Sequence, residues 1–147
     1  MISRQRRPVA FVATLAALGI ALTSTLAAPV PASAANTVKI GVDLPTSGAD
    51  ATNGIPTRNG VILAVEQANS KPHPGGIKFE VSSLDDAVQR LHDPAQGAQN
   101  VKTFIADSAV LGMVGPFNSN VAKAEIPLTN DAGLVQISPS NTNTGLT

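Results

Sequence analysis

Three segments rich in serine, threonine, asparagine and glycine carry the side chains best suited to hold a small polar molecule. These segments are residues 45–53, 115–120 and 138–147, and Asp50 is the only charged side chain among them. Their hydroxyl and amide groups can both donate and accept hydrogen bonds. The pattern favours a neutral polar binding surface, although the same residue types are also the ordinary material of loops and helix caps.

The second of these segments also opens a predicted helix. Asn118, Ser119 and Asn120 stand where that helix begins. The first amide groups of a helix have no partner within the helix, and they attract anions. This position therefore favours a negatively charged group such as a carboxylate.

Catalytic and metal sites are not indicated. His73 and His92 lie near strand–helix connections without the spacing of metal ligands, and we expect both to be exposed loop residues. The acidic pair Asp85 and Asp86 is expected to cap a loop or to be solvated rather than to bind a cation. The nucleophile elbow, the zinc-helix motif and the nucleotide-binding loops are all missing from the sequence. We expect no enzyme activity, metal or cofactor.

The polar segments must be positioned by elements that alternate along the chain. Apolar residues alternate or run continuously in four short segments, which predicts β-strands. Three longer segments between them show the spacing of a helix face. The predicted strands are residues 38–44, 77–84, 110–114 and 134–137. The predicted helices are residues 54–69, 93–106 and 120–132.

Individual residues support these boundaries. Asp93 can cap the second helix by accepting from its first amides, and Gln96 can complete a capping box. Pro127 predicts a kink or a late start in the third helix, and Gly133 suits the position just after its end. The continuous apolar run at residues 110–114 predicts a central strand buried on both faces.

Alternating strands and helices with short connections predict an α/β fold: a parallel sheet with helices on both faces. In such sheets, ligands bind beyond the carboxyl ends of the strands, where the strand order reverses. All three polar segments follow a predicted strand directly. They should therefore share one edge of the sheet.

The start of the chain has the pattern of an export signal. Arg4, Arg6 and Arg7 precede a mostly apolar run at residues 9–28, and Ala32-Ser33-Ala34 provides small residues for a peptidase. We expect residues 1–34 to be removed between Ala34 and Ala35. An uncleaved membrane anchor is the alternative, and the paired arginines also raise the twin-arginine export route.

The composition of the remaining residues limits the classes of molecule that the protein is expected to bind. Three of the ten basic residues and none of the ten acidic residues lie in the first 34. Residues 35–147 therefore contain seven basic and ten acidic residues, and their net charge is −3. This balance argues against nucleic acid and anionic membrane surfaces. The chain has no cysteine, which excludes disulfides and a lipid anchor on a cysteine. We expect a soluble periplasmic or secreted protein.

The order of several motifs resembles the branched-chain amino acid binding proteins of ABC uptake systems, which have the type I periplasmic binding protein fold. The resemblance covers nearly all of residues 38–147. It is carried by VKIGVDLPTSG, NGVILAVEQAN, GGIKFEV and DPAQGAQNVKTFI, and most specifically by GPFNSN and ISPSNTNTGLT.

This resemblance implies an amino-acid ligand held between two lobes that close around it. Ser119 and Thr142 would offer hydroxyl and amide groups to the ligand carboxylate, and the carbonyl of Ser140 would accept from its ammonium group. Asn53 falls in the first polar segment, where many members of the family have an aromatic residue over the ligand side chain. The resemblance also implies an ABC permease as partner and a monomer at full length.

The length of the chain implies only part of such a protein. Residues 35–147 match the N-terminal part of a first lobe, so we expect a truncated lobe whose last strand is an unprotected edge. Two other functions remain open. One is a sensory ligand-binding domain of a receptor, and the other is a secreted flavodoxin-like hydrolase using Asp85, His92 and Ser119.

Overall fold

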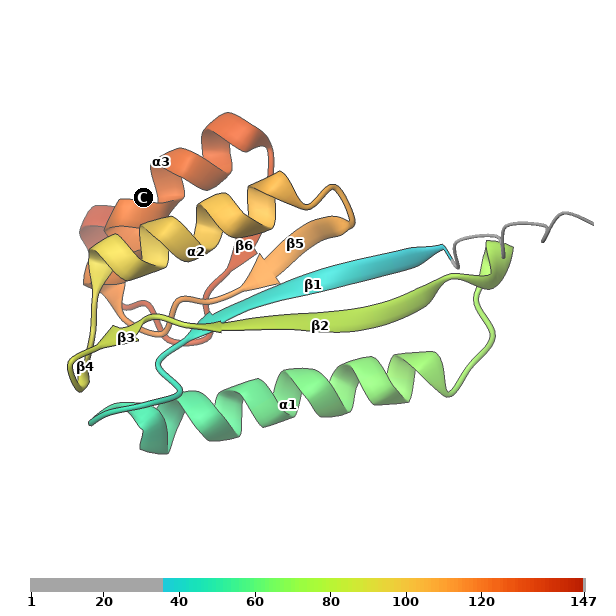
Figure 1. Ribbon diagram of the computed structural model, residues 1–147, viewed down its shortest axis with the longest axis horizontal. Coiled ribbons are helices and arrows are strands. Elements are labelled where there is room, and N and C mark those ends of the chain that lie inside the picture. Colours follow the sequence, from blue (N-terminus) through green and yellow to red (C-terminus); the bar gives the residue numbers. More distant parts are fainter. Residues whose placement is uncertain (1–35, 147) are drawn as a thin grey trace, which may run out of the picture. The chain divides into compact units, whose positions relative to one another are not determined.

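A four-stranded parallel sheet forms the centre of the computed structural model, which describes residues 36–146 (Figure 1). Its strands are β1 (Thr37–Leu44), β2 (Lys78–Asp85), β5 (Val110–Val114) and β6 (Val135–Ile137), in the spatial order β2-β1-β5-β6. The four predicted strands are confirmed to within one residue at each end. The expected export signal, residues 1–34, lies outside the described residues.

Helices cover both faces of the sheet, as predicted (Figure 1). Helix α1 (Ala51–Asn69) packs on one face, against β1 and β2, and helices α2 (Pro94–Ala106) and α3 (Ser119–Ala132) pack together on the other. Two short 3-10 helices, η1 (Pro74–Gly76) and η2 (Thr144–Leu146), follow α1 and β6. None of the helices within residues 36–146 is both long enough and apolar enough to cross a membrane.

The core lies between the sheet and the pair α2–α3. Val101 and Phe104 of α2 pack on Val110 and Met113 of β5, and all four are buried. Three partly buried leucines, one from a strand and two from the α3 region, surround this cluster: Leu84, Leu128 and Leu134. Removing a large apolar side chain from water contributes about 1.5–3 kcal/mol, so this layer is the main source of stability.

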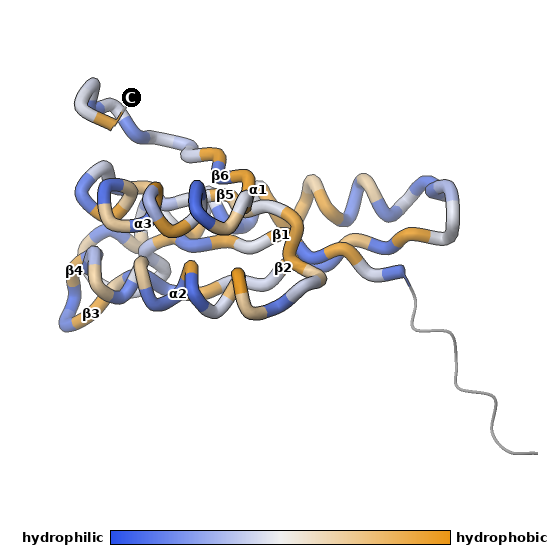
Figure 2. Tube along the Cα trace, turned by 90° about the horizontal axis from the view of Figure 1, so that it is seen from above, coloured by the Kyte–Doolittle hydropathy of each residue, from blue (hydrophilic) through white to orange (hydrophobic). Residues whose placement is uncertain are grey.

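The opposite face is covered unevenly. Figure 2 shows apolar residues along the strands and along α1, but α1 lies over β1 and β2. Leu111, Val135 and Ile137 of β5 and β6 are therefore 61%, 60% and 63% exposed. Strand β5 pairs on both edges, as predicted for a central strand, but the expectation that both its faces are buried is wrong. Strand β6 pairs only with β5, which confirms that it is an edge strand within the described residues.

The start of α2 follows the predicted capping in part. Asp93 Oδ1 accepts from the Gln96 amide at 2.8 Å, and Pro94 occupies the first turn. The other half of the capping box is wrong, because the Gln96 side chain donates to Asn100 Oδ1 instead. The Asp93 amide donates to the Asp86 carbonyl, which removes the need for a partner from Gln96.

Helices α1 and α3 begin earlier than predicted, whereas the end of α3 agrees with the prediction. Helix α1 begins at Ala51, three residues earlier than predicted, so Asn53 lies in its first turn and not in a loop. Helix α3 begins at Ser119 and runs through Pro127, so the proline does not delay its start. Gly133 follows α3 in the left-handed conformation with φ +68°, as predicted.

A short antiparallel hairpin was not predicted. Strands β3 (Ala87–Val88) and β4 (Leu91–His92) are joined by Gln89 and Arg90, which have φ values of +50° and +86°. Two-residue turns of this kind usually contain glycine, asparagine or aspartate. Gln-Arg carries no such signal, so the sequence pattern could not reveal the turn.

Gly115→Ala is expected to destabilise the fold by about 3 kcal/mol or more, because two costs add. Gly115 has φ +131°, and a Cβ there would lie 2.1 Å from the carbonyl oxygen of Asp43. Denaturant unfolding measures the change. Gly60→Ala in α1 is the control, since a Cβ there meets nothing within 4 Å and should stabilise the helix by about 0.5–1 kcal/mol. Equal stability of the two variants would contradict this account of Gly115.

Candidate ligand-binding site

The carboxyl ends of β1, β5 and β6 meet at one edge of the sheet because the strands are parallel. The strand order reverses between β1 and β5, which is the position where open α/β sheets bind ligands. Residues 115–118 lead from β5 into α3 at this edge, and residues 138–143 follow β6. Two of the three polar segments are therefore neighbours in space.

Ser119 and Thr142 are in direct contact. Ser119 is the first residue of α3, and its Oγ accepts from the Thr142 amide at 3.3 Å. Ser119 is half-buried and Thr142 is exposed, so both remain accessible from solvent. The amides of the first helical turn lie at the same place, where the helix dipole favours a negative charge.

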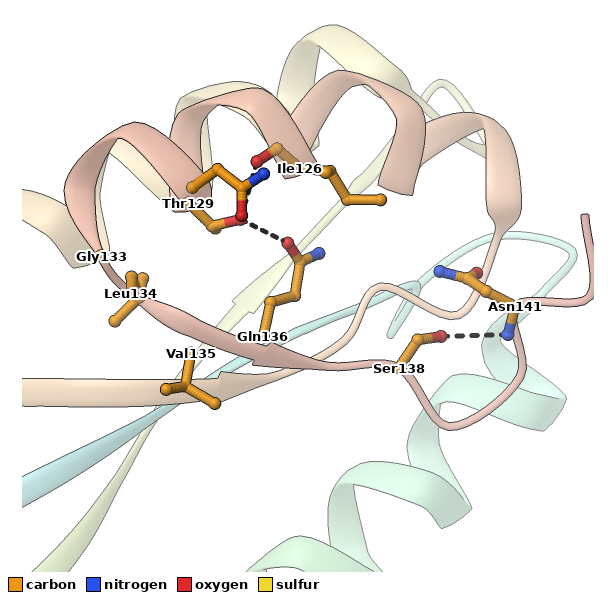
Figure 3. Close-up of a pocket in the computed structure, with 9 residues that line it drawn as sticks. Ile126, Thr129, Gly133, Leu134, Val135, Gln136, Ser138 and Asn141 are labelled. Carbon is orange, nitrogen blue, oxygen red and sulfur yellow. Dashed lines mark hydrogen bonds between the residues drawn. The ribbon is translucent and has the colours of Figure 1, made fainter. Parts of the chain in front are cut away.

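The two loops are also joined by Ser138. Its hydroxyl donates to the Pro116 carbonyl at 2.8 Å and accepts from the amides of Ser140 and Asn141 at 3.2 and 3.0 Å. Figure 3 shows the Ser138–Asn141 bond at the turn that follows β6. Ser140 thus lies in a turn closed by Ser138, next to Thr142. Ser138 belonged to a predicted polar segment, but nothing in the sequence distinguished it from its neighbours.

Asn53 stands apart from these residues. It is exposed on the first turn of α1, and its carbonyl accepts from the Thr57 hydroxyl. No hydrogen bond joins it to Ser119, Ser140 or Thr142 in the part of the chain that the structure describes. The structure thus brings together three of the four predicted site residues.

The hollow between α3 and β6 does not contain the predicted site. A cavity of about 460 Å³ lies between the end of α3 and β6, where Figure 3 shows Thr129, Gln136 and Ser138 around it. It extends to Asn141 but does not include Ser119 or Thr142. The predicted contacts therefore form an open edge and not an enclosed pocket.

A buried polar network lies beneath this edge, and sequence analysis missed it. Gln136 Nε2 donates to Glu125 Oε2 at 2.7 Å and to the Gly115 carbonyl at 3.2 Å. Gln136 Oε1 accepts from the Thr129 hydroxyl at 2.8 Å. On the far side, Asn100 Nδ2 donates to Asp43 Oδ1 at 2.6 Å. The network connects β1, α2, α3 and β6 to the first residue of the loop after β5.

Asp43 and Glu125 form a buried pair of carboxyl groups at the centre of this network. Both are fully buried, and Asp43 Oδ2 and Glu125 Oε1 have no other partner. A Cβ on Gly97 would lie 3.3 Å from the first oxygen and 2.6 Å from the second, so the glycine provides the space for the pair. Burial, followed by the hydrogen bond with Asp43 and its charge, raises the pKa of Glu125 to about 10. One proton between the two oxygens satisfies both.

One feature of the sequence could have revealed Glu125. It lies four residues after Val121 and three before Leu128, on the predicted inner face of the third helix. Val121, Glu125 and Thr129 are buried in α3. A carboxyl group at an apolar position of a helix pattern indicates a buried partner.

The acidic pair after β2 divides into two environments. Asp85 Oδ1 accepts from the amides of Thr46 and Ala87 at 2.8 and 3.0 Å, which confirms the expected capping role. Asp86 is fully buried, so the expectation that it could be solvated is wrong. Burial, followed by the charges of Asp43, Asp85 and Asp50, raises the pKa of Asp86 to about 7.

Neither histidine is exposed, contrary to expectation, although His73 lies in a loop as predicted. His92 lies in β4 with its Nδ1 against the Asp50 carboxylate, and this pair ties the hairpin to the start of α1. His73 Nε2 lies 2.9 Å from the Ala68 carbonyl, and its ring packs edge-on against Phe79. Within residues 36–146, no group of three acidic, histidine or cysteine side chains has the geometry to hold a metal ion.

Comparison with known sequences gives one family. The model of the periplasmic binding protein family matches residues 37–147. The chain is 32% identical over 106 residues to the Leu/Ile/Val-binding protein homolog 2 of Brucella abortus, covering 72% of this chain and 27% of that protein. It is 30% identical over 125 residues to homolog 1 of the same organism, covering 85% of this chain and 32% of that protein. The chain thus spans about a third or less of these relatives.

Solved structures similar to this chain come from the same class of protein. The branched-chain amino acid transporter substrate binding protein LivJ of Streptococcus pneumoniae, in complex with isoleucine, matches with a TM-score of 0.67 and 32% identity, over 75% of this chain and 30% of that one. A putative branched-chain amino acid ABC transporter protein of Rhodospirillum rubrum matches with a TM-score of 0.68 and 25% identity, over 75% of this chain and 31% of that one. Both likenesses confirm the expected α/β fold class, and each covers less than a third of the other protein.

Proposed function

Because this chain belongs to the periplasmic binding protein family, we propose that it takes part in binding a branched-chain or closely related amino acid for an ABC uptake system. The observation that carries the proposal is the contact between Ser119 and Thr142 at the carboxyl edge of the sheet. The names of the relatives support the ligand class. We propose binding without catalysis.

The proposed contacts follow from the chemistry of an amino acid. Ser119 and Thr142 would donate hydroxyl and amide hydrogens to its carboxylate, assisted by the start of α3. The Ser140 carbonyl would accept from its ammonium group. Asn53, in the first turn of α1, would lie toward the ligand side chain when a second lobe closes.

The proposed mechanism is closure of two lobes around the ligand. A ligand held only by an open edge leaves its other polar groups in water and gains little from desolvation. A second lobe that contacts the same ligand would stabilise the closed form. We propose that the protein is exported by residues 1–34, is released by cleavage after Ala34, and delivers its ligand to a membrane permease.

Calorimetric titration of the natural protein without residues 1–34 tests this proposal. The panel contains leucine, isoleucine, valine and small amides, with D-leucine as the control for stereospecific recognition. At least one L-amino acid should bind, and D-leucine should bind at least about tenfold more weakly, because it cannot satisfy the same carboxylate and ammonium contacts together. No binding across the panel would overturn the proposed function.

A further inference from the structure

The direct contact between the two ligand loops is too weak to fix their geometry. The Thr142–Ser119 bond is 3.3 Å long and exposed. Hydrogen bonds of this length are at the weak end of the normal range, and water competes for exposed ones. Another group must therefore hold residues 115–118 and residues 138–143 together.

Ser138 lies where the backbone pairing of β5 and β6 ends. Val114 pairs with Ile137, and the Gly115 amide then donates to the Ile137 carbonyl at 2.9 Å. Pro116 has no amide hydrogen, so it cannot donate to a further backbone bond. The Ser138 hydroxyl donates to the Pro116 carbonyl instead, and this side-chain bond continues the connection between the loops beyond the sheet.

The same hydroxyl determines the direction of the Ser140 carbonyl. The Asn141 amide points toward Ser138 Oγ, from which it is 3.0 Å away. The peptide between Ser140 and Asn141 is trans, and the N–H and C=O of a planar trans peptide point in opposite directions. The Ser140 carbonyl must therefore point away from Ser138. A serine hydroxyl has one hydrogen to donate and two lone pairs, and all three are engaged here.

We propose that Ser138 is a positioning residue of the amino-acid site: it joins the two ligand loops and directs the Ser140 carbonyl toward the ligand ammonium group. This inference rests on the proposed function. Ser138 does not contact the ligand itself in this account. Its effect should therefore concern the ammonium group more than the carboxylate.

The test compares leucine with 4-methylpentanoate, which has the same carbon skeleton and carboxylate but lacks the ammonium group. Titration calorimetry on the natural protein without residues 1–34 gives both affinities for the unchanged protein and for Ser138→Ala. We expect Ser138→Ala to weaken leucine about tenfold, the loss of one charge-assisted hydrogen bond, and to change 4-methylpentanoate less than about twofold. Ser138→Thr, which keeps the hydroxyl, should retain the original ratio of affinities.

The controls separate positioning from a general loss of structure. Ser70→Ala removes a hydroxyl that donates to the Gln67 carbonyl at the end of α1, and should change neither affinity. If Ser138→Ala does not fold, Ser138→Cys provides the same comparison with a weaker donor. If the ratio of the leucine affinity to the 4-methylpentanoate affinity stays unchanged, whether both fall equally or neither falls, the role of Ser138 is overturned and the proposed function is not. Failure of the unchanged protein to bind any amino acid or amide of the panel would overturn the proposed function, and this inference with it.

Discussion

Replacing Ser119 and Thr142 together by alanine should weaken the binding of a branched-chain amino acid by about a hundredfold. Each hydroxyl that donates to the ligand carboxylate makes a charge-assisted hydrogen bond worth about 1.5–3 kcal/mol. The change also removes the Ser119 hydroxyl that accepts from the Thr142 amide. A hundredfold loss corresponds to about 2.7 kcal/mol, less than two full bonds, because backbone amides at the start of α3 remain.

Titration calorimetry measures this loss, and a matched control exists within the chain. Ser70 and Thr103 also carry hydroxyl groups that bond to helix carbonyls, of Gln67 and Gln99, and both hydroxyls are exposed. Ser70→Ala with Thr103→Ala should leave the affinity unchanged. If the Ser119 and Thr142 variant binds as tightly as this control, the carboxylate is held elsewhere.

The free energy of unfolding should fall as the pH rises from about 5 to about 9. Asp86 and Glu125 have ordinary pKa values of 3.8 and 4.5, and the fold raises them to about 7 and about 10. The folded chain therefore retains two protons that the unfolded chain releases. The stability that these two groups contribute is fully present below their pKa values in the unfolded chain. It is lost as the pH rises toward their pKa values in the folded chain. Each retained proton contributes a slope of up to about 1.4 kcal/mol per pH unit.

The ion pair between Lys39 and Asp107 acts outside this range. The pKa of Asp107 is lowered by its hydrogen bond with Lys39, and that of Lys39 is raised by the same bond. Asp107 therefore changes stability below about pH 4 and Lys39 above about pH 10. The slope between pH 5 and 9 belongs to the buried carboxyl groups.

Two substitutions separate the two contributions, because neither amide titrates. Asp86→Asn should reduce the slope by about half between pH 5 and 7 and leave the slope above pH 7 unchanged, whereas Glu125→Gln should reduce the slope below pH 7 by about half and remove most of it above pH 7. Urea unfolding of the chain without residues 1–34 at pH 5, 7 and 9 gives the free energies. Stability that stays constant or rises between pH 5 and 9 would contradict the shared proton.

The sheet and its helices could be predicted because their signals are local. Val38, Ile40 and Val42 alternate along β1, and Asp93 followed by Pro94 marks the start of α2. The parallel order of the strands then follows from the alternation of strands and helices. Placing the polar segments at one edge needs no side-chain detail, so the neighbourhood of Ser119 and Thr142 could be expected.

The features that escaped prediction depend on contacts between distant residues. Asp86 looks like a solvated aspartate in the sequence, but it is fully buried in the structure. Its amide donates to the Leu44 carbonyl, and the hairpin β3–β4 follows it directly; neither feature is visible in the sequence. Asn53 belongs to α1 because that helix begins earlier than its apolar pattern. The role of Ser138 depends on Pro116, 22 positions earlier in the chain. Periodicity along the chain carries no information about such pairs.

The space that Gly97 provides for Asp43 and Glu125 has an evolutionary consequence. Any side chain at position 97 would displace the carboxyl oxygens that share the proton. Removing either carboxyl group alone would leave the other buried without its partner. We therefore expect substitutions at the three positions to be tolerated in combination and not singly. Residues 43, 97 and 125 should then change together among homologues, although 82 positions separate the first from the last.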